Sequence, residues 1–146
     1  MAYCIELAKQ ALNNGNPPVG SIIILDDQII GEGIESVKPT NDVTNHAEIV
    51  AIRDAISKGH FNDLPKSALY STHEPCIMCS YLIRQHKIPL IVYGSAVDHI
   101  GGHSSKFDIL STESVSKWEV KPKIIGGILK SECTALTSQY QHNLNK

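Results

Sequence analysis

The sequence lacks any long apolar run, and stretches such as Ile22 to Leu25 have only the length of a strand. A membrane-spanning helix needs roughly 20 consecutive apolar residues, so we expect no membrane partner. The first residues also lack the basic segment and following apolar stretch that mark a secretory signal. These two absences favour a cytoplasmic protein.

Cysteine and clustered basic residues are scarce too. Four cysteines in a chain without an export signal argue against a disulfide framework and for thiolate chemistry. We expect Cys4 and Cys133 to be ordinary buried thiols. The formal net charge is −2, and residues 138–146 contain a single lysine. Because tight binding to a phosphate backbone depends on several Lys and Arg contacts, these features disfavour a nucleic acid substrate.

What is present is the composition of an ordinary globular chain, 42% apolar and 19% charged over 146 residues. This predicts one domain over residues 1–146. Apolar periodicity predicts helices over 3–13, 46–58, 75–85 and 127–140, strands over 19–25, 29–34, 68–72, 88–93 and 120–125, and loops over 36–44 and 94–105. Asn45 is the expected cap of the second helix, and Gly59 its end. A hairpin followed by alternating helices and strands predicts an α/β fold with a mixed central sheet of about five strands flanked by helices.

Two short motifs carry residues with metal-binding chemistry. His46-Ala47-Glu48 opens the second predicted helix, and Pro75-Cys76-Ile77-Met78-Cys79 opens the third. His46, Cys76 and Cys79 offer three zinc ligands, whereas a closed structural zinc site takes four and a catalytic site keeps a position for water. Near the first turn of a helix, free backbone N–H groups stabilise thiolates. The spacing therefore predicts a catalytic zinc site.

Glu48 lies close to the metal in this arrangement without being a ligand. Zinc makes water nucleophilic at neutral pH, and ammonia leaves a ring carbon only when it is protonated. One group must then take a proton from water and return it to the leaving nitrogen, which is the role we expect for Glu48. The pattern H-x-E followed by P-C-x-x-C is typical of zinc-dependent deaminases that act on nucleobases.

The competing interpretation is a structural zinc module. It would need a fourth ligand, for which the nearest candidate is His73 and the others are His99 and His103. A single C-x-x-C or a lone histidine would not decide between the two. The joint occurrence of both motifs in an α/β chain favours the catalytic site.

The chain resembles the cytidine deaminase superfamily, in its branch of tRNA adenosine deaminases, guanine deaminases and cytosine deaminases. The resemblance covers almost all of the sequence and is carried by residues 18–20, 42–48, 74–79 and 127–136. It implies a three-layer fold, a zinc cofactor, a hydrolase acting on the C–N bonds of cyclic amidines, and a homodimer. It also implies substrate contacts from Val19 and from backbone groups of Ala47 and Cys76.

Three departures from the tRNA enzymes bear on the substrate. Glu35 stands where those enzymes usually have an asparagine, and an ionised carboxylate only accepts hydrogen bonds. A substrate-facing Glu35 would favour N–H or hydroxyl groups over the acceptor N1 of adenine; the alternative is a solvated carboxylate at a strand end. Ala96 and Val97 replace charged residues expected to face RNA, and the tail lacks a basic cluster.

From these departures we expect deamination of a free nucleobase or nucleoside with a guanine-, isocytosine- or cytosine-like ring. The first alternative is a tRNA-specific adenosine deaminase, which the closing segment 127–136 favours. The second is a regulatory protein that binds zinc without turnover, against which the presence of Glu48 argues.

Overall fold

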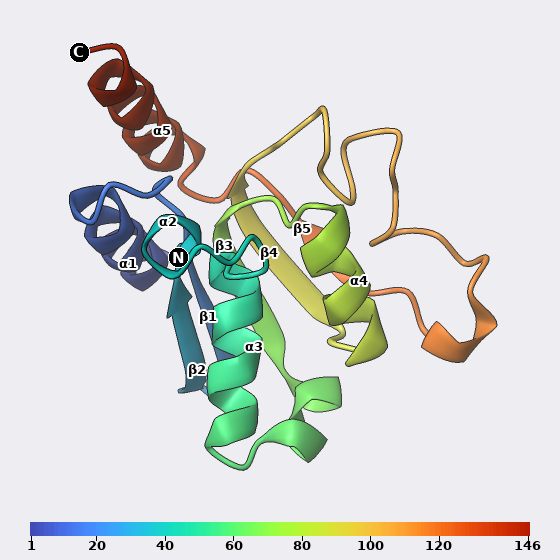
Figure 1. Ribbon diagram of the computed structural model, residues 1–146. Coiled ribbons are helices and arrows are strands. Elements are labelled where there is room, and N and C mark those ends of the chain that lie inside the picture. Colours follow the sequence, from blue (N-terminus) through green and yellow to red (C-terminus); the bar gives the residue numbers. More distant parts are fainter.

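The computed structural model describes residues 1–146 and contains a five-stranded sheet in the order β2-β1-β3-β4-β5 (Figure 1). The strands are β1 (Gly20–Leu25), β2 (Gln28–Ile34), β3 (Ala68–His73), β4 (Leu90–Ser95) and β5 (Lys123–Ile125). β1 runs antiparallel to β2 and β3, while β3, β4 and β5 are mutually parallel. The predicted α/β fold with a mixed five-stranded sheet is confirmed.

Helices cover both faces of this sheet and complete three layers. They are α1 (Ala2–Asn13), α2 (Val37–Thr40), α3 (Ala47–Ser57), α4 (Ile77–Gln85) and α5 (Lys130–Leu144), with short 3-10 turns η1 (Phe61–Lys66) and η2 (Ser116–Trp118). Because side chains alternate along a strand, Ile23 faces α3 and α4 in the main core while Ile22 faces α1. α5 packs against α1 through Cys133 and Leu136. Cys4 and Cys133 are buried and free, as expected. None of the helices has the length and apolar character that crossing a membrane would require.

Two glycines in β2 let α3 lie directly on the sheet. A Cβ on Gly31 would stand 2.4 Å from the carbonyl oxygen of Ala51, and one on Gly33 would stand 2.4 Å from that of Ala47. No larger residue fits at either position without moving α3. This close contact fixes the first turn of α3, where the H-x-E motif lies.

The helix starts differ slightly from the predicted ones. α3 begins at Ala47, with His46 as its N-cap, and α4 begins at Ile77, with Cys76 as its N-cap. Asn45 is not the cap, because its side chain donates to Thr40 Oγ1 and accepts from Arg53. The predicted loop over 36–44 contains α2, and the last predicted strand shrinks to the three residues that follow Pro122.

The long segment between β4 and β5 is fastened to α4 by a buried arginine. Nη1 of Arg84 donates to the carbonyl oxygens of Ile109, Leu110 and Thr112 at 2.9–3.0 Å. Its guanidinium also lies 4.9 Å from the ring centroid of Trp118. These contacts hold a segment whose only helical element is the short turn η2.

Candidate active site

The three predicted ligands meet where α3 and α4 begin. Nδ1 of His46 lies 3.5 Å from the sulfur of Cys76 and 3.5 Å from the sulfur of Cys79. All three potential ligand atoms lie within 4.8 Å of one another. Zn–S bonds of about 2.3 Å and Zn–N bonds of about 2.0 Å at tetrahedral angles would separate N from S by about 3.5 Å. The donor types and their spacing therefore fit a zinc ion.

No fourth protein ligand joins this cluster. The metal-binding group consists of His46, Cys76 and Cys79 alone. Nε2 of His73 is engaged with Thr137 instead, and Nδ1 of His103 with Ser111. A structural zinc module needs a fourth residue, so the arrangement fits a catalytic site with one open position.

The electrostatics of the metal-free cluster favour a thiolate at Cys76. Hydrogen bonds from the Cys79 thiol and from His46 lower the pKa of Cys76 to about 4, although its burial opposes this. The Cys76 sulfur in turn raises the pKa of His46 to about 9. Cys76 is thus already in the deprotonated form that zinc requires, while binding of the metal would displace protons from His46 and Cys79.

Glu48 is buried beside the ligands, and only 3% of its surface is exposed. The Ser71 hydroxyl donates to its Oε1 at 2.8 Å, and its Oε2 lies 3.5 Å from the Cys79 sulfur. Burial raises the pKa of Glu48 to about 7, and the nearby Glu35 charge acts in the same direction. A carboxyl with a pKa near neutrality can both accept and return a proton at physiological pH.

Of the two positions considered for Glu35 from the sequence, only the solvated one is wrong, because the carboxylate is buried and also lines the cavity described below. It is 5% exposed, so it is not a solvated carboxylate. Its Oε2 accepts the Ala47 N–H at 3.1 Å, and its Oε1 lies 3.9 Å from Nε2 of His46. Burial raises its pKa, against the opposing effect of His46. The carboxylate is thus directed at the start of α3 and at the imidazole nitrogen opposite the sulfurs.

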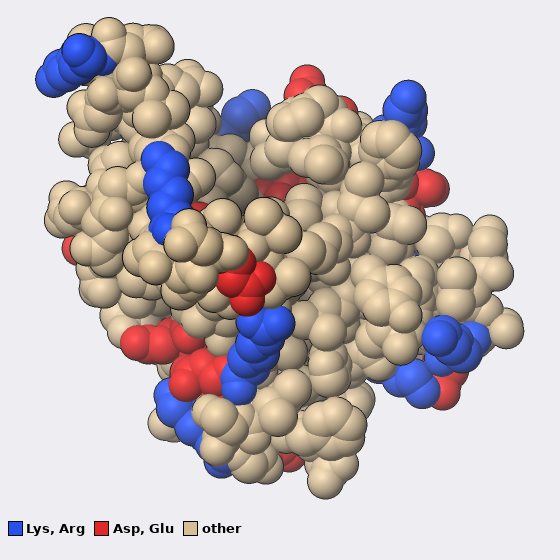
Figure 2. All heavy atoms as spheres, in the orientation of Figure 1, with Lys and Arg blue, Asp and Glu red and all other residues tan.

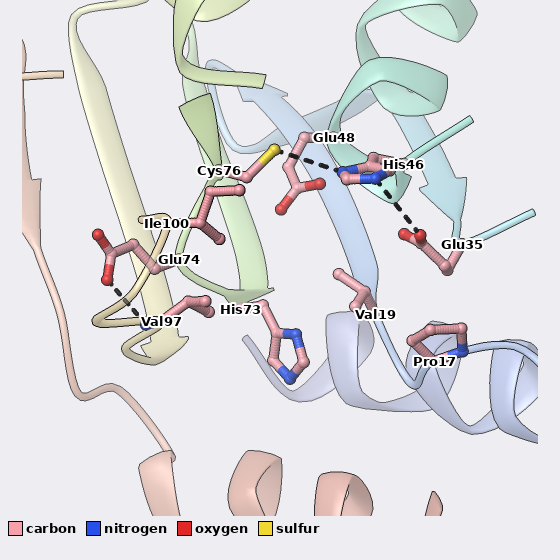
Figure 3. A pocket seen from close by; sticks show the side chains of 10 residues that line it. All are labelled: Pro17, Val19, Glu35, His46, Glu48, His73, Glu74, Cys76, Val97 and Ile100. Atoms are coloured by element: carbon pink, nitrogen blue, oxygen red, sulfur yellow. Dashed lines mark hydrogen bonds and ion pairs between the residues drawn. The ribbon is translucent and has the colours of Figure 1, made fainter. Parts of the chain in front are cut away.

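A cavity of about 260 Å³ opens in front of this cluster (Figure 3). The side chains that line it are Pro17, Val19, Glu35, His46, Glu48, His73, Glu74, Cys76, Val97 and Ile100. Val19 is among them, and its contact with substrate stays a prediction. Ala47 does not line the cavity, because it is fully buried and its N–H is bound to Glu35.

Glu74 is a residue of the site to which the sequence assigned no role. Its carboxylate accepts N–H groups of Val97, His103 and Ser104 and the Ser104 hydroxyl. Burial opposes ionisation, but the hydrogen bonds from Ser104 and its neighbours lower the pKa of Glu74 below its ordinary value. It thereby fixes the loop that brings Val97 and Ile100 to the cavity. Its place next to Pro75 and Cys76 was the only available sign of a role.

Comparison with known proteins identifies the family and its fold. Residues 1–95 match the model of the cytidine and deoxycytidylate deaminase zinc-binding region. A solved structure from a study of A-to-I editing by tRNA:A34 deaminases superposes with a TM-score of 0.84 at 29% identity, covering 93% of this chain and 96% of that one. A guanine deaminase from Nitrosomonas europaea superposes with a TM-score of 0.80 at 19% identity, covering 97% of this chain and 82% of that one, a likeness of fold alone.

Relatives in sequence carry more specific names. A "tRNA-specific adenosine deaminase 2" from Xenopus tropicalis is 34% identical over 151 residues, which cover 99% of this chain and 88% of the relative. A "tRNA-specific adenosine deaminase" from Aquifex aeolicus is 37% identical over 125 residues, covering 84% of this chain and 83% of the relative.

These relatives contradict the expectation of a free nucleobase or nucleoside substrate and favour its first alternative. That expectation rested partly on Glu35 reading the substrate, whereas in the structure its two oxygens lie at the Ala47 N–H and near Nε2 of His46. The expected zinc cofactor and enzyme class are confirmed, which removes the non-catalytic alternative. The chain belongs to the cytidine and deoxycytidylate deaminase zinc-binding family and is a zinc-dependent hydrolase acting on C–N bonds of cyclic amidines.

Proposed function

We propose that this protein deaminates adenosine in tRNA to inosine. The observation that carries the proposal is the similarity, over 99% of the chain, to a tRNA-specific adenosine deaminase. The site supports it, because a cavity of about 260 Å³ beside the metal ligands accommodates one base and leaves the rest of an RNA outside. The whole of residues 1–146 acts in this proposal as one deaminase domain.

The chemical roles follow from the geometry. His46, Cys76 and Cys79 hold zinc, which when bound supplies a Lewis acid that makes water nucleophilic at neutral pH. Glu48 takes the proton of the attacking water and returns it to the departing amino group, so that ammonia leaves as a neutral molecule. The Ser71 hydroxyl, donating to Oε1 of Glu48, leaves Oε2 as the oxygen nearer the ligands.

Glu35 acts in this scheme on the metal ligand instead of on the base. The negative charge of Glu35, 3.9 Å from Nε2 of His46, favours a proton on that nitrogen and leaves Nδ1 to bind the metal. Its second oxygen holds the N–H of Ala47, which follows His46 in the chain. The position that carries asparagine in the tRNA enzymes is thus used here to orient the histidine.

The charge distribution bears on how RNA would be held. On the face shown in Figure 2, Lys and Arg side chains stand apart from one another and alternate with acidic ones. With a net charge of −2, a single chain offers few phosphate contacts. A second copy would double the surface available to RNA.

We place a homodimer contact on α3 and α4. The two helices enclose a mostly apolar groove of about 240 Å³, lined among others by Ile52, Ile56, Tyr81 and Leu82. Tyr81 is 50% exposed and Ile56 is 36% exposed, so an apolar surface meets solvent in the single chain.

Because all four cysteines are free and none is paired, we also propose that the protein acts in the reducing cytoplasm.

The experiment that tests this function compares substrates on the zinc-loaded protein. A tRNA anticodon stem-loop with one target adenosine is offered beside free adenosine, guanine and cytidine, and inosine and ammonia are measured. We expect kcat/KM on the stem-loop to exceed that on any free compound by about 100-fold or more, because remote contacts contribute to the transition state. Deamination of a free compound with none on the stem-loop would contradict the proposal.

Two variants assign the activity to this site. Glu48→Gln should retain about one zinc per subunit and lose inosine formation by a factor of about 100 to 10,000. Glu113→Gln, which changes an exposed carboxylate outside the cavity, is the matched control and should keep full activity. A Glu48→Gln variant as active as the control would refute the role of Glu48.

A further inference from the structure

A second cavity adjoins the metal-site cavity and is larger, at about 420 Å³. It lies between the end of β4, the loop that follows, and α5, and its lining includes Ser95, Asp98, Thr134 and Thr137. His73 and Val97 line both cavities. A substrate that extends beyond one ring would therefore pass His73 on its way from the first cavity to the second.

The hydrogen bonds of His73 assign the positions of its ring hydrogens. The hydroxyl of Thr137 donates its single hydrogen to the carbonyl oxygen of Cys133, at 3.3 Å. The hydroxyl oxygen of Thr137 also lies 2.9 Å from Nε2 of His73. Because its hydrogen is already donated, this oxygen accepts in that contact. The two contacts form together only when Nε2 carries the ring proton, which leaves Nδ1 with a free lone pair.

Nδ1 of His73 has no hydrogen-bond partner within the protein. It is not fully buried, so it can accept a hydrogen bond from a group in the cavity. In Figure 3 one nitrogen of the ring is directed toward the side of the cavity that carries Val19, and the other toward α5 below it. Burial lowers the pKa of His73, which keeps the ring neutral. The ring therefore presents a fixed acceptor to the cavity.

We propose that His73 determines specificity for RNA by accepting, at Nδ1, a hydrogen bond from a ribose 2′-hydroxyl at the junction of the two cavities. The inference rests on the proposed action on tRNA and adds to it the group that reads the sugar. His73 positions substrate in this role and takes no part in proton transfer.

The choice of a ribose hydroxyl follows from the layout of the site. The amino group that leaves must lie beside Glu48 and the metal ligands, which fixes the base at that end of the first cavity. The part of a nucleotide that reaches His73 is then the sugar, of the target adenosine or of its neighbour in the chain. A 2′-hydroxyl is the donor that distinguishes RNA from DNA at such a place.

Matched variants separate the acceptor from the rest of the side chain. Asparagine places its Oδ1 where Nδ1 of His73 lies, so His73→Asn keeps an acceptor but loses the bond to Thr137. Glutamine reaches Thr137 with its amide nitrogen, so His73→Gln keeps that bond but has no acceptor at the Nδ1 position. Thr137→Ser retains the hydroxyl and is the control for changes in α5.

Each protein is assayed on four stem-loops: one all-ribose, and three with a single 2′-deoxy nucleotide at the target adenosine, at its 5′ neighbour or at its 3′ neighbour. We expect one deoxy substitution to lower kcat/KM about three- to tenfold with the unchanged protein, His73→Asn and Thr137→Ser, the effect of one net hydrogen bond. With His73→Gln that stem-loop and the all-ribose one should react equally. Zinc content and thermal unfolding check that each variant is folded and loaded.

The outcomes distinguish failure of this inference from failure of the proposed function. If stem-loops are deaminated and no deoxy substitution matters, or if His73→Gln discriminates as the unchanged protein does, the role of His73 is refuted and the tRNA function stands. If no stem-loop is deaminated, both fail. The tautomer has its own test: ¹⁵N NMR of the imidazole should show a protonated Nε2, and a proton on Nδ1 would overturn the proposal.

Discussion

Replacing Glu48 by glutamine should stabilise the metal-free protein at pH 8 while it removes turnover. In the folded chain burial raises the pKa of Glu48 from its ordinary 4.5 to about 7. That difference in pKa corresponds to about 3 kcal/mol. Ionisation of the buried carboxyl lowers the free energy of unfolding by this amount. Glutamine has the same shape, keeps an oxygen for the Ser71 hydroxyl, and does not ionise.

The sign of the pH dependence follows from the same pKa. Below pH 4.5 the carboxyl is protonated in both the folded and the unfolded chain, so the two proteins should be about equally stable. Between pH 4.5 and 7 the folded state binds more protons than the unfolded one, and the stability of the unchanged protein falls as pH rises. Above pH 7 the advantage of Glu48→Gln should be constant at about 3 kcal/mol.

The assay is urea unfolding at pH 5 and pH 8, in the presence of a chelator, followed by circular dichroism. Glu74→Gln is the matched control of opposite sign, because hydrogen bonds lower the pKa of Glu74 and its ionised form therefore stabilises the fold above its ordinary pKa. That variant should be less stable than the unchanged protein at pH 8, and this difference in stability should become smaller at lower pH. Equal stability of Glu48→Gln and the unchanged protein at pH 8 would refute the reasoning.

Three further substitutions have defined outcomes. Glu35→Gln should weaken zinc binding about 10- to 100-fold in a chelator competition while the fold remains, because the negative charge beside Nε2 of His46 is lost; unchanged affinity would show that Glu35 does not act on the ligand. Cys76→Ala should lose the metal and lower the thermal midpoint, since metal binding and folding are coupled, and full zinc occupancy would contradict the ligand assignment. Arg84→Met should cost about 2–4 kcal/mol in urea unfolding, because three backbone carbonyls lose their donor; a change below about 0.5 kcal/mol would show that water replaces it.

Local patterns were enough to predict most of the elements and the three residues that cluster as potential metal ligands. Ala51, Ile52 and Ala55 recur at helical spacing in α3, and they are buried in the main core as that spacing requires. The H-x-E and P-C-x-x-C motifs each lie within one helix start, so their internal geometry depends on a few neighbouring residues. The fold class and the zinc chemistry were therefore accessible from the sequence.

Residues whose roles depend on contacts distant in the chain were not accessible in this way. Glu35 meets Ala47 because the end of β2 lies against the start of α3, a contact that Gly33 permits. Glu74 is surrounded by a loop about 25 residues further on, whose path no local periodicity describes. The direction of a buried carboxylate is a property of the tertiary structure, and a sequence gives only its position.

The same distinction explains why the substrate expectation failed while the chemistry held. Net charge and the absence of a basic run describe how strongly one isolated chain attracts a phosphate backbone, and that affinity can come from a second subunit or from a few well-placed contacts. They carry no information on which base fits beside the metal. Specificity within the cavity depends instead on the direction of single polar atoms, and two of them, Oε1 of Glu35 and Nδ1 of His73, point where the sequence did not indicate. Oε1 of Glu35 lies 3.9 Å from Nε2 of a metal ligand, His46, and in our proposal Nδ1 of His73 offers an acceptor to the substrate.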